Sequence, residues 1–298
     1  MAAPVIAVIS VGDMGRGVAV RLKEGGARVI SCLEGRSEAT KARASSAGVE
    51  LIAEPAEMVR QADIVLSIVP PGAAVELAQR IGALIAGAQV RPTYIDCNAI
   101  SAATMRQVGD IIARAGAEAG DVGIIGGPPD KARATKFYAA GPRLPAFQVL
   151  KALGLDVRWI GGELGQASAL KMGYGGFTKG LQALATALMV SARRAGVAEA
   201  LEAELADSQA GLLAMLDRSL PGMPAKAYRW VAEMEEGAAS LREAGLPPDL
   251  FEGAARLYEA IADTATARAA PIGARVELTR SALMDALARE LRTLELKS

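Results

Sequence analysis

Short apolar runs alternate with helical patterns along the first half of the chain. Four runs have the length and near-continuous hydrophobicity of strands that are buried on both faces: VIAVI, ARVISCL, ADIVLSIV and PTYIDCN. Apolar residues recur at helical spacing between them, over residues 16–25, 38–47, 73–85 and 102–115. Strands of this kind joined by helices predict a parallel sheet covered on both faces. Three further strand candidates follow: EAGDVGII, ATKFYAAG and DVRWIG.

The pattern changes after Gly165, where the strand candidates stop. Residues 166–195 have the periodicity of one long helix, and helical segments continue to the end, broken by turns at LPGMP and GLPPD. The sequence therefore predicts an α/β Rossmann-type dinucleotide-binding domain over residues 1–162. An all-α domain over residues 163–298 follows, and the long helix joins the two.

A glycine-rich turn follows the first apolar run, at Ser10-Val11-Gly12-Asp13-Met14-Gly15. A strand before it, a helix after it and a second strand ending about 20 residues later match the dinucleotide-binding βαβ unit. Gly12 would let the backbone approach a pyrophosphate, and Gly15 would permit close helix–strand packing. Ser10 occupies the first glycine position, which mainly serves the tight turn. The alternative is an ordinary strand–turn–helix connection.

The residues after the second strand bear on which nicotinamide nucleotide binds. Glu34 lies where an acidic side chain accepts bonds from a free ribose 2′-hydroxyl, as in NAD. Arg36 and Ser37 offer a guanidinium and a hydroxyl, which suit the 2′-phosphate of NADP. A solvated turn is the third interpretation, and these residues alone leave the three open.

Composition removes several kinds of chemistry. The chain has no histidine, which excludes a His–Asp acid–base pair and histidine-based zinc sites. An acid or base must then be Lys, Tyr, a carboxylate or bound water. Lys plus Arg equals Asp plus Glu at 33 each, so nothing favours nucleic acid or an anionic membrane as partner. No metal site is expected.

The location is expected to be cytoplasmic. The start MAAPVIAV lacks the features of a signal peptide, and the longest apolar helical stretch, LQALATALMVSA, is too short to cross a bilayer. The two cysteines, Cys32 and Cys97, have no partner spacing and are expected to be buried free thiols.

Several motifs in order along the chain show a resemblance. They are VGDMG in the glycine-rich turn, SIVPPGAA after the third strand candidate, DCNAIS at 96–101, GDVGIIGGPP at 120–129, GQASALKMGYGGFTKG at 165–180 and RWVAEMEE at 229–236. The chain resembles the β-hydroxyacid dehydrogenase superfamily, which includes 3-hydroxyisobutyrate and 6-phosphogluconate dehydrogenases. It is most similar to a branch whose C-terminal domain has no known function.

The resemblance implies a cofactor, a catalytic residue and an assembly. The EGRS stretch is similar to one that the branch uses with NADP, which favours NADP over NAD. Lys171 matches the family's catalytic lysine, although by its residues alone it reads as a surface lysine. Burial at a cleft lowers the pKa of a lysine, which would suit it to exchange a proton with a substrate hydroxyl. The family usually dimerises through its helical halves, so a homodimer is expected.

The resemblance also assigns binding residues, though the chain departs from the family at three places. Gly175 stands where a substrate-binding asparagine is usual, Ile125 replaces a serine, and Ala232 replaces a lysine. Tyr174 and Arg229 are expected to compensate, Tyr174 as a hydrogen-bond donor or as the acid. The expected cofactor contacts are Ser10, Gly12, Asp13, Met14, Gly15, Arg36, Ser37, Val69, Pro70 and Asn98. The expected substrate contacts are Asn98, Gly126, Gly127, Lys171, Tyr174, Gly175, Thr178 and Arg229.

Helical spacing places Lys171, Tyr174, Gly175, Thr178 and Gln182 on one broad face of the long helix. Its four glycines, at 173, 175, 176 and 180, each cost roughly 0.8–1 kcal/mol relative to Ala. Either a ligand or a crossing helix must therefore approach the backbone there.

Three hypotheses about function remain. The first is an NADP-dependent oxidoreductase that acts on a small hydroxy or keto compound, expected to carry a carboxylate, with Lys171 as acid/base. The second is an NADPH-dependent reductase of imines, against which the retained lysine argues. The third is an NADP-binding sensor without catalysis, which the lost substrate-side residues favour.

Overall fold

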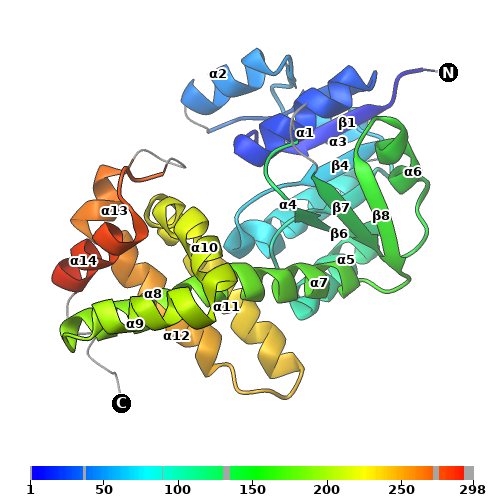
Figure 1. Ribbon diagram of the computed structural model, residues 1–298. Helices are drawn as coiled ribbons and strands as arrows, with labels where there is room; N and C mark the ends of the chain where they lie inside the picture. Colours follow the sequence, from blue (N-terminus) through cyan, green and yellow to red (C-terminus); the bar gives the residue numbers. More distant parts are fainter. Residues whose placement is uncertain (1, 36–37, 89, 130–134, 271–274, 292–298) are drawn as a thin grey trace. The chain divides into compact units, whose positions relative to one another are not determined.

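The computed structural model describes residues 2–35, 38–88, 90–129, 135–270 and 275–291, and within these the chain divides into two compact units, Met1–Met172 and Gly173–Ser298. An eight-stranded sheet in the order β3-β2-β1-β4-β5-β6-β7-β8 forms the centre of the first unit (Figure 1). The strands are β1 Val5–Ile9, β2 Arg28–Ser31, β3 Glu50–Leu51, β4 Ile64–Ser67, β5 Thr93–Asp96, β6 Ala119–Ile125, β7 Lys136–Ala140 and β8 Asp156–Gly161.

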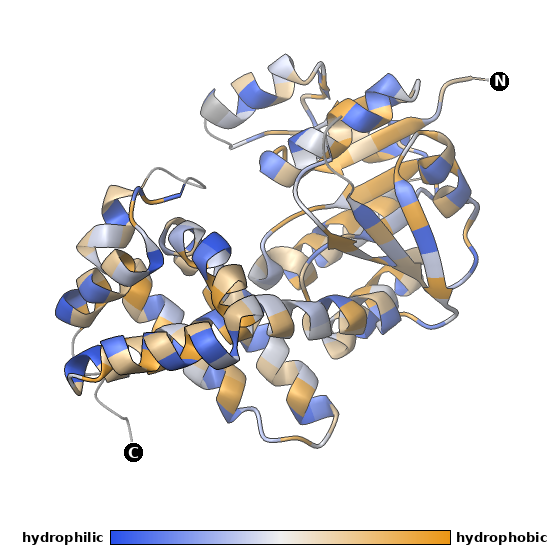
Figure 2. Cartoon of the chain, in the orientation of Figure 1, coloured by the Kyte–Doolittle hydropathy of each residue, from blue (hydrophilic) through white to orange (hydrophobic). Residues whose placement is uncertain are grey.

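Helices cover both faces of this sheet, as the apolar pattern predicts. One face packs against α1 Asp13–Glu24, α2 Glu38–Ser46 and α6 Pro145–Ala152. The other face packs against α3 Pro55–Gln61, α4 Ala74–Gly87 and α5 Ala102–Arg114. Neighbouring residues on a strand join different cores: Val8 packs with α1, while Ala7 and Ile9 pack with α3 and α4. Figure 2 shows the resulting hydrophobic character of the central strands.

The sheet confirms the predicted strands and differs in its details. β3, α3 and α6 were not expected, because segments this short carry too little periodicity to stand out. β7 runs antiparallel to β6, whereas the other pairings are parallel. The predicted parallel sheet is confirmed for the first four strand candidates, whereas β7 belongs to the three that follow them, and an antiparallel neighbour needs no crossover helix.

The predicted long helix is helical from α7, Gln166–Gly175, through α8, Leu181–Arg194, with a π turn over Gly176–Gly180. The π turn inserts an extra residue into the helical ladder. Residues before and after it therefore do not keep the α-helical spacing on which the single broad face depends. The boundary between the two compact units, after Met172, lies within α7, whereas the sequence places it before the helix.

The second unit is all helical. Its further helices are α9 Ala198–Ser208, α10 Ala210–Ser219, α11 Ala227–Glu243, α12 Asp249–Ala262, α13 Ala265–Ala269 and α14 Arg280–Glu290. α11 lies along α12, and an edge-to-face contact between Trp230 and Tyr258, with ring centroids 5.2 Å apart, lies between them. The core also includes Met189 of α8 and Leu283 of α14. Within the described residues, no helix combines the length and the apolar character that a membrane crossing requires.

Candidate active site

The glycine-rich turn adopts a strained backbone at its first position. Ser10 has φ +70°, and it is the one non-glycine residue with positive φ in the described parts of the chain. This left-handed conformation costs an L-residue roughly 1–2 kcal/mol and is usual for glycine. A Cβ on Gly15 would lie 2.2 Å from the Ser10 carbonyl oxygen, so helix α1 is pressed against the turn. The backbone thus has the shape that the motif predicts, with serine in place of the first glycine.

Helix α1 begins directly after Gly12, which serves as its N-cap. Gly12 has no side chain to accept the first amide hydrogens of the helix, so the N–H groups of the first turn are available to an anion. A Cβ on Gly12 would meet no described atom within 4 Å. Open space at Gly12 and close packing at Gly15 fit a dinucleotide whose pyrophosphate rests on this turn.

A cleft of about 400 Å³ opens beside the turn, at the carboxyl ends of β1, β2 and β4. Its lining includes Ser10, Cys32, Glu34, Gly35 and Val69, together with Met58 of α3 and Arg80 of α4. Arg36 and Ser37 lie outside the described residues, but they follow Gly35 directly. The cleft has the place and the size of a site for the adenosine end of a nicotinamide nucleotide.

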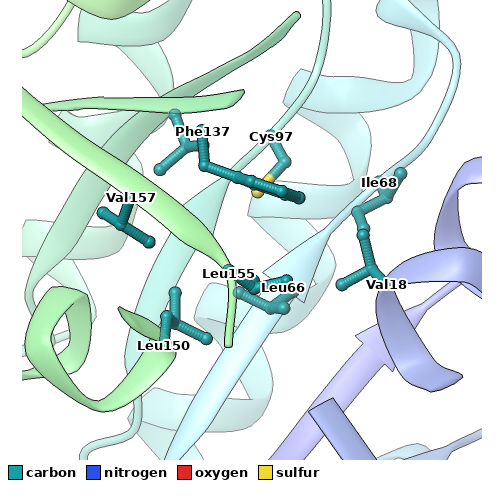
Figure 3. Close-up of a pocket in the computed structure, with 9 residues that line it drawn as sticks. Val18, Leu66, Ile68, Cys97, Phe137, Leu150, Leu155 and Val157 are labelled. Carbon is teal, nitrogen blue, oxygen red and sulfur yellow. The ribbon is translucent and has the colours of Figure 1, made fainter. Parts of the chain in front are cut away.

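A second, internal void lies between the sheet and helices α1 and α6 (Figure 3). Val18, Leu66, Phe137 and Leu150 are among its apolar lining, with the Cys97 thiol the sole sulfur. Its volume of about 10 Å³ is too small for a substrate. Cys97 is therefore a buried core thiol, as expected, whereas Cys32 is half-buried.

A buried polar row crosses three neighbouring strands, at the carboxyl ends of β4 and β5 and within β6. Ser67 of β4 is in register with Asp96 of β5, and Asp96 with Asp121 of β6. All three are at most 1% exposed. Parallel partners in register project to the same face of a sheet, so the row lies on one side, the side covered by α4 and α5.

Asn98 ties this row to the loop after β4. Its amide nitrogen Nδ2 donates to Ser67 Oγ at 2.8 Å and to Asp96 Oδ2 at 2.7 Å, and its Oδ1 accepts from the Val69 N–H at 2.6 Å. The Asn98 N–H also donates to Asp96 Oδ1 at 2.8 Å. Both amide hydrogens of the side chain are thus engaged within the protein.

The Asp96 carboxyl is easier to protonate than an ordinary aspartate. Burial raises its pKa to about 7, against an opposing effect of the hydrogen bonds from Asn98. The negative charge of Asp121 raises it further, and the positive charge of Lys171 lowers it. Lys171 therefore lies close enough to act electrostatically on the carboxyl end of β5.

The base of Lys171 rests on strand β6. A Cβ on Gly123 would lie 3.2 Å from Lys171 Cβ and 2.7 Å from the Ala167 carbonyl oxygen, so α7 lies directly on the strand at this glycine. Lys171 is half-buried. The structure thus places Lys171 beside the buried polar row, within the same compact unit as the cleft next to the glycine-rich turn.

The loop after β6 carries the two glycines that the resemblance assigns to substrate. Gly126 has φ +129° and is exposed, and the Gly127 carbonyl accepts from Thr135 Oγ1 at 2.6 Å. A positive φ of this kind is open to glycine and strained for other residues. The loop therefore presents backbone where the serine of the family is replaced by Ile125.

The expected substrate residues of the second unit have differing surroundings. Tyr174 is 52% exposed, and Arg229 is exposed on α11. Thr178 Oγ1 donates back to the Tyr174 carbonyl at 2.9 Å, while Gln182, which was expected on the same face, is buried. The π turn lies between Tyr174 and Gln182, so the shared face of these two residues stays a prediction.

The glycines of the helix have two explanations, one for each pair. A Cβ on Gly176 or Gly180 would lie 2.8 or 3.2 Å from the ring of Phe251 on α12, so these two receive an aromatic side chain. Gly173 and Gly175 have no described atom within 4 Å of a Cβ. Packing against α12 thus accounts for Gly176 and Gly180. At Gly173 and Gly175 the described residues leave open space beside the backbone.

Sequence reasoning missed several polar groups. Asp96 and Asp121 each interrupt or end an apolar strand run, which is an available signal for a buried carboxyl. Lys179 forms an ion pair with Glu233 of α11, with its Nζ 5.8 Å from the Trp230 ring centroid, and nothing in their spacing predicts that pairing. Among the described residues, no group of three or more Cys, Asp or Glu side chains has the arrangement of a metal site.

Comparison with known proteins agrees with this geometry, which defines a Rossmann-type nicotinamide-binding protein. Residues 5–161 match the NAD binding domain of 6-phosphogluconate dehydrogenase, and residues 192–261 match a domain of unknown function, DUF1932. The chain belongs to the family defined by that NAD-binding domain, within the β-hydroxyacid dehydrogenase superfamily. The resemblance found in the sequence is confirmed.

The individual relatives share 30% of their residues or fewer with this chain. An uncharacterized 28.5 kDa protein of Methanothermus fervidus is 30% identical over 173 residues, which is 58% of this chain and 65% of that protein. The conserved protein MTH1747, described as structurally similar to 3-hydroxyacid dehydrogenases, is 29% identical with a TM-score of 0.65, over 89% of this chain and 98% of its own. The 3-hydroxyisobutyrate dehydrogenase of Mycobacterium tuberculosis is 20% identical with a TM-score of 0.69, over 96% and 99%. This last likeness shows the fold alone.

Proposed function

We propose that the protein is an NADP-dependent oxidoreductase that interconverts a small hydroxy compound and the corresponding carbonyl compound, with Lys171 as the acid/base. The observation that carries the proposal is the position of Lys171. Its Cβ lies against β6, and its charge acts on Asp96 at the carboxyl end of β5, the same edge at which the cleft beside the glycine-rich turn opens. Ligands of open α/β sheets bind at this edge.

The cofactor would be held by the turn and the cleft. In this proposal the pyrophosphate rests on the backbone of Ser10, Gly12, Asp13, Met14 and Gly15, and Val69 and Pro70 flank the cofactor. Arg36 and Ser37 would bind the 2′-phosphate, which favours NADP over NAD. When bound, the nicotinamide supplies or accepts the hydride.

The chain's own residues would orient the substrate and move one proton. The Lys171 amine takes the proton of the substrate hydroxyl in oxidation and returns it in reduction. Backbone N–H groups of Gly126 and Gly127 would hold a substrate carboxylate. Because both amide hydrogens of Asn98 are engaged, we assign it to fixing Val69 and Asp96 in place. Tyr174, Gly175 and Arg229 remain candidate substrate contacts from the helical unit, whereas the Thr178 hydroxyl is bonded to its own helix.

The proposal is tested by turnover of NADPH with a panel of keto acids and cyclic imines, and of NADP with β-hydroxy acids. Lys171→Ala is expected to lower kcat by about 100- to 10,000-fold, the usual contribution of a general acid/base, without weakening NADPH binding. Lys151→Ala, which removes an exposed lysine of α6, is the matched control and keeps wild-type turnover. Near-normal kcat in Lys171→Ala contradicts the assignment, and turnover of cyclic imines alone favours the imine reductase hypothesis.

The cofactor choice has its own test. Arg36→Ala is expected to raise KM for NADPH while leaving KM for NADH unchanged, because only NADPH carries the 2′-phosphate. An unchanged ratio of the two KM values would show that Arg36 has no part in the selection.

We further propose a homodimer through the helical unit. Leu184 and Leu188, four residues apart on α8, are 52% and 57% exposed, and Phe177 of the π turn is 80% exposed. Large apolar side chains that gather on one helix face are typical of an interface. Leu188→Glu is expected to yield monomers in sedimentation velocity; a dimer that persists would place the interface elsewhere.

A further inference from the structure

We propose that Asp121 is a positioning residue for Lys171, which it sets in place by holding the N-terminus of helix α7. The inference rests on the proposed role of Lys171 as the acid/base. Asp121 lies in the middle of β6 and is 1% exposed, a place where a carboxyl is normally unfavourable. Its partners explain why it is there.

The Asp121 carboxylate binds the first residues of α7 with both oxygens. Oδ2 accepts from the N–H groups of Gly165, Ala167 and Ser168 at 2.9, 3.0 and 3.0 Å, and Oδ1 accepts from Ser168 Oγ at 2.7 Å. These amides belong to the start of the helix, where the backbone has no partners of its own. A negative charge at this end is also favoured by the helix dipole.

The opposing effects on the ionisation of Asp121 reflect this arrangement. Burial raises the pKa of Asp121, and the bonds from Ser168, Gly165 and Ala167 oppose that rise. The hydrogen bonds from α7 therefore favour the charged form of the carboxylate. The charged carboxylate in turn stabilises the start of α7. Such a mutually dependent pair fixes one position of the helix end.

Strand β6 provides a second contact to the same helix. Gly123 is two residues beyond Asp121, so both face α7 from one side of the strand. At Gly123 the helix lies so close that a Cβ would meet the Ala167 carbonyl at 2.7 Å and Lys171 Cβ at 3.2 Å. Asp121 thus fixes the start of the helix, and Gly123 fixes its approach one turn later.

Two fixed points along one helix determine both its position and its rotation about its axis. Lys171 follows in the second turn of α7, with Cβ on the strand and its charge acting on Asp96, the register partner of Asp121. The direction in which the Lys171 amine leaves the helix therefore depends on Asp121. A loosened helix end would let this amine move relative to the carboxyl edge of the sheet.

The test compares three variants. Asp121→Asn keeps the shape and a carbonyl acceptor for the three N–H groups but removes the negative charge, so that these charge-assisted bonds become ordinary ones. Ser168→Ala removes a single bond to Asp121 and is the milder change. Thr264→Ala is the matched control, because it removes the capping hydroxyl of α13, also buried, from a helix that does not carry Lys171.

Two readouts are needed, of which the first requires no substrate. Hydrogen–deuterium exchange of residues 165–172 is expected to accelerate about 10-fold or more in Asp121→Asn and less in Ser168→Ala, with wild-type rates in Thr264→Ala. In the full-length enzyme, kcat is expected to fall about 100-fold in Asp121→Asn, the usual result of a misplacement near 1 Å, with Kd for NADPH unchanged. Ser168→Ala is expected to show a smaller fall in kcat.

Each outcome decides the inference. Faster exchange in α7 with wild-type kcat would make Asp121 a stabilising residue only and overturn the proposal, as would unchanged exchange. Should Asp121→Asn fail to fold, the same two measurements on Ser168→Ala decide. Retained turnover in Lys171→Ala is the separate result that refutes the proposed function, whatever the variants of Asp121 show.

Discussion

The two units both contain glycine-rich segments, and their glycines serve different purposes. At residues 10–15 the close approach is between backbones, with the Gly15 position 2.2 Å from the Ser10 carbonyl oxygen. At residues 173–180 the close approach is between a helix and a side chain, the ring of Phe251 against Gly176 and Gly180. In the first segment the glycines allow a tight turn between a strand and a helix. In the second they make room for an aromatic side chain, so glycine content alone does not distinguish the two purposes.

The buried charges of the two units differ as well. In the helical unit Arg280 is 8% exposed and bonds to Asp217 and Glu202. Burial raises the pKa of Glu202, but its bonds to Arg193 and Arg280 outweigh this and leave its pKa below the usual value. In the α/β unit Asp96 is bonded to the neutral Asn98, and burial raises its pKa to about 7. One unit pairs its buried charges, and the other keeps a carboxyl that titrates near neutral pH.

The largest expected effect concerns this titration. The pKa of Asp96 is about 7 in the folded protein against an ordinary 3.8, so between these values the folded state binds a proton that the unfolded state lacks. The resulting stabilisation is complete below about pH 4 and is lost as the pH rises through 7. Relative to Asp96→Asn, the wild type should lose roughly 4 kcal/mol of unfolding free energy across this window.

Urea unfolding of both proteins at pH 4, 5, 6, 7 and 8 measures that difference, with the exposed Asp110→Asn as the control. The Lys171 charge lowers the pKa of Asp96, so Lys171→Met should move the midpoint to higher pH. A stability difference that does not vary with pH would contradict the contrast drawn between the two units.

The next effect tests the backbone contact at the glycine-rich turn. Gly15→Ala places a Cβ against the Ser10 carbonyl and should destabilise the protein by about 3 kcal/mol, because neither backbone can move aside cheaply. Gly12→Ala, where the space is open, should fold normally and weaken NADPH binding only. Thermal unfolding and NADPH fluorescence titrations separate these outcomes, and equal stability of the two variants would show that the close packing is wrong.

A smaller effect tests the packing in the helical unit. Gly176→Ala should cost about 1–2 kcal/mol, since its Cβ meets the Phe251 ring at 2.8 Å and the ring must shift. Gly173→Ala meets no described atom and should stabilise the helix by up to about 1 kcal/mol. Thermal unfolding of both variants is the measurement, and opposite signs are the expected result.

The smallest effect concerns Thr178. Its hydroxyl is bonded to carbonyls of its own helix, at 2.9 Å to Tyr174 and 3.3 Å to Gly175. Thr178→Val should therefore change KM for the substrate by less than about twofold, because the hydroxyl that is lost is already bonded to carbonyls of its own helix. A tenfold rise in KM would instead identify Thr178 as a substrate contact.

The features that could be predicted from the sequence are those with a periodic hydrophobic pattern and those that require glycine at particular positions. The strands of the sheet other than β3, the helical second half and the turn at residues 10–15 follow from periodicity and from glycine positions. The pairing of Asp121 with α7 joins residues 44 to 47 positions apart, and no local pattern specifies which helix end a buried carboxyl will meet. The π turn was also beyond prediction, because no local pattern announces contacts such as that of its Lys179 carbonyl, which accepts from the Tyr258 hydroxyl at 2.5 Å.

Ser10 has a consequence for how relatives of this chain are recognised. A search rule that demands glycine at all three motif positions would discard this protein, although its main chain bends as the rule intends. The feature that shapes the turn here is a dihedral angle, which serine adopts in this chain at a modest energetic penalty. Detection based on torsion angles would therefore recover members of such families that letter-based fingerprints overlook.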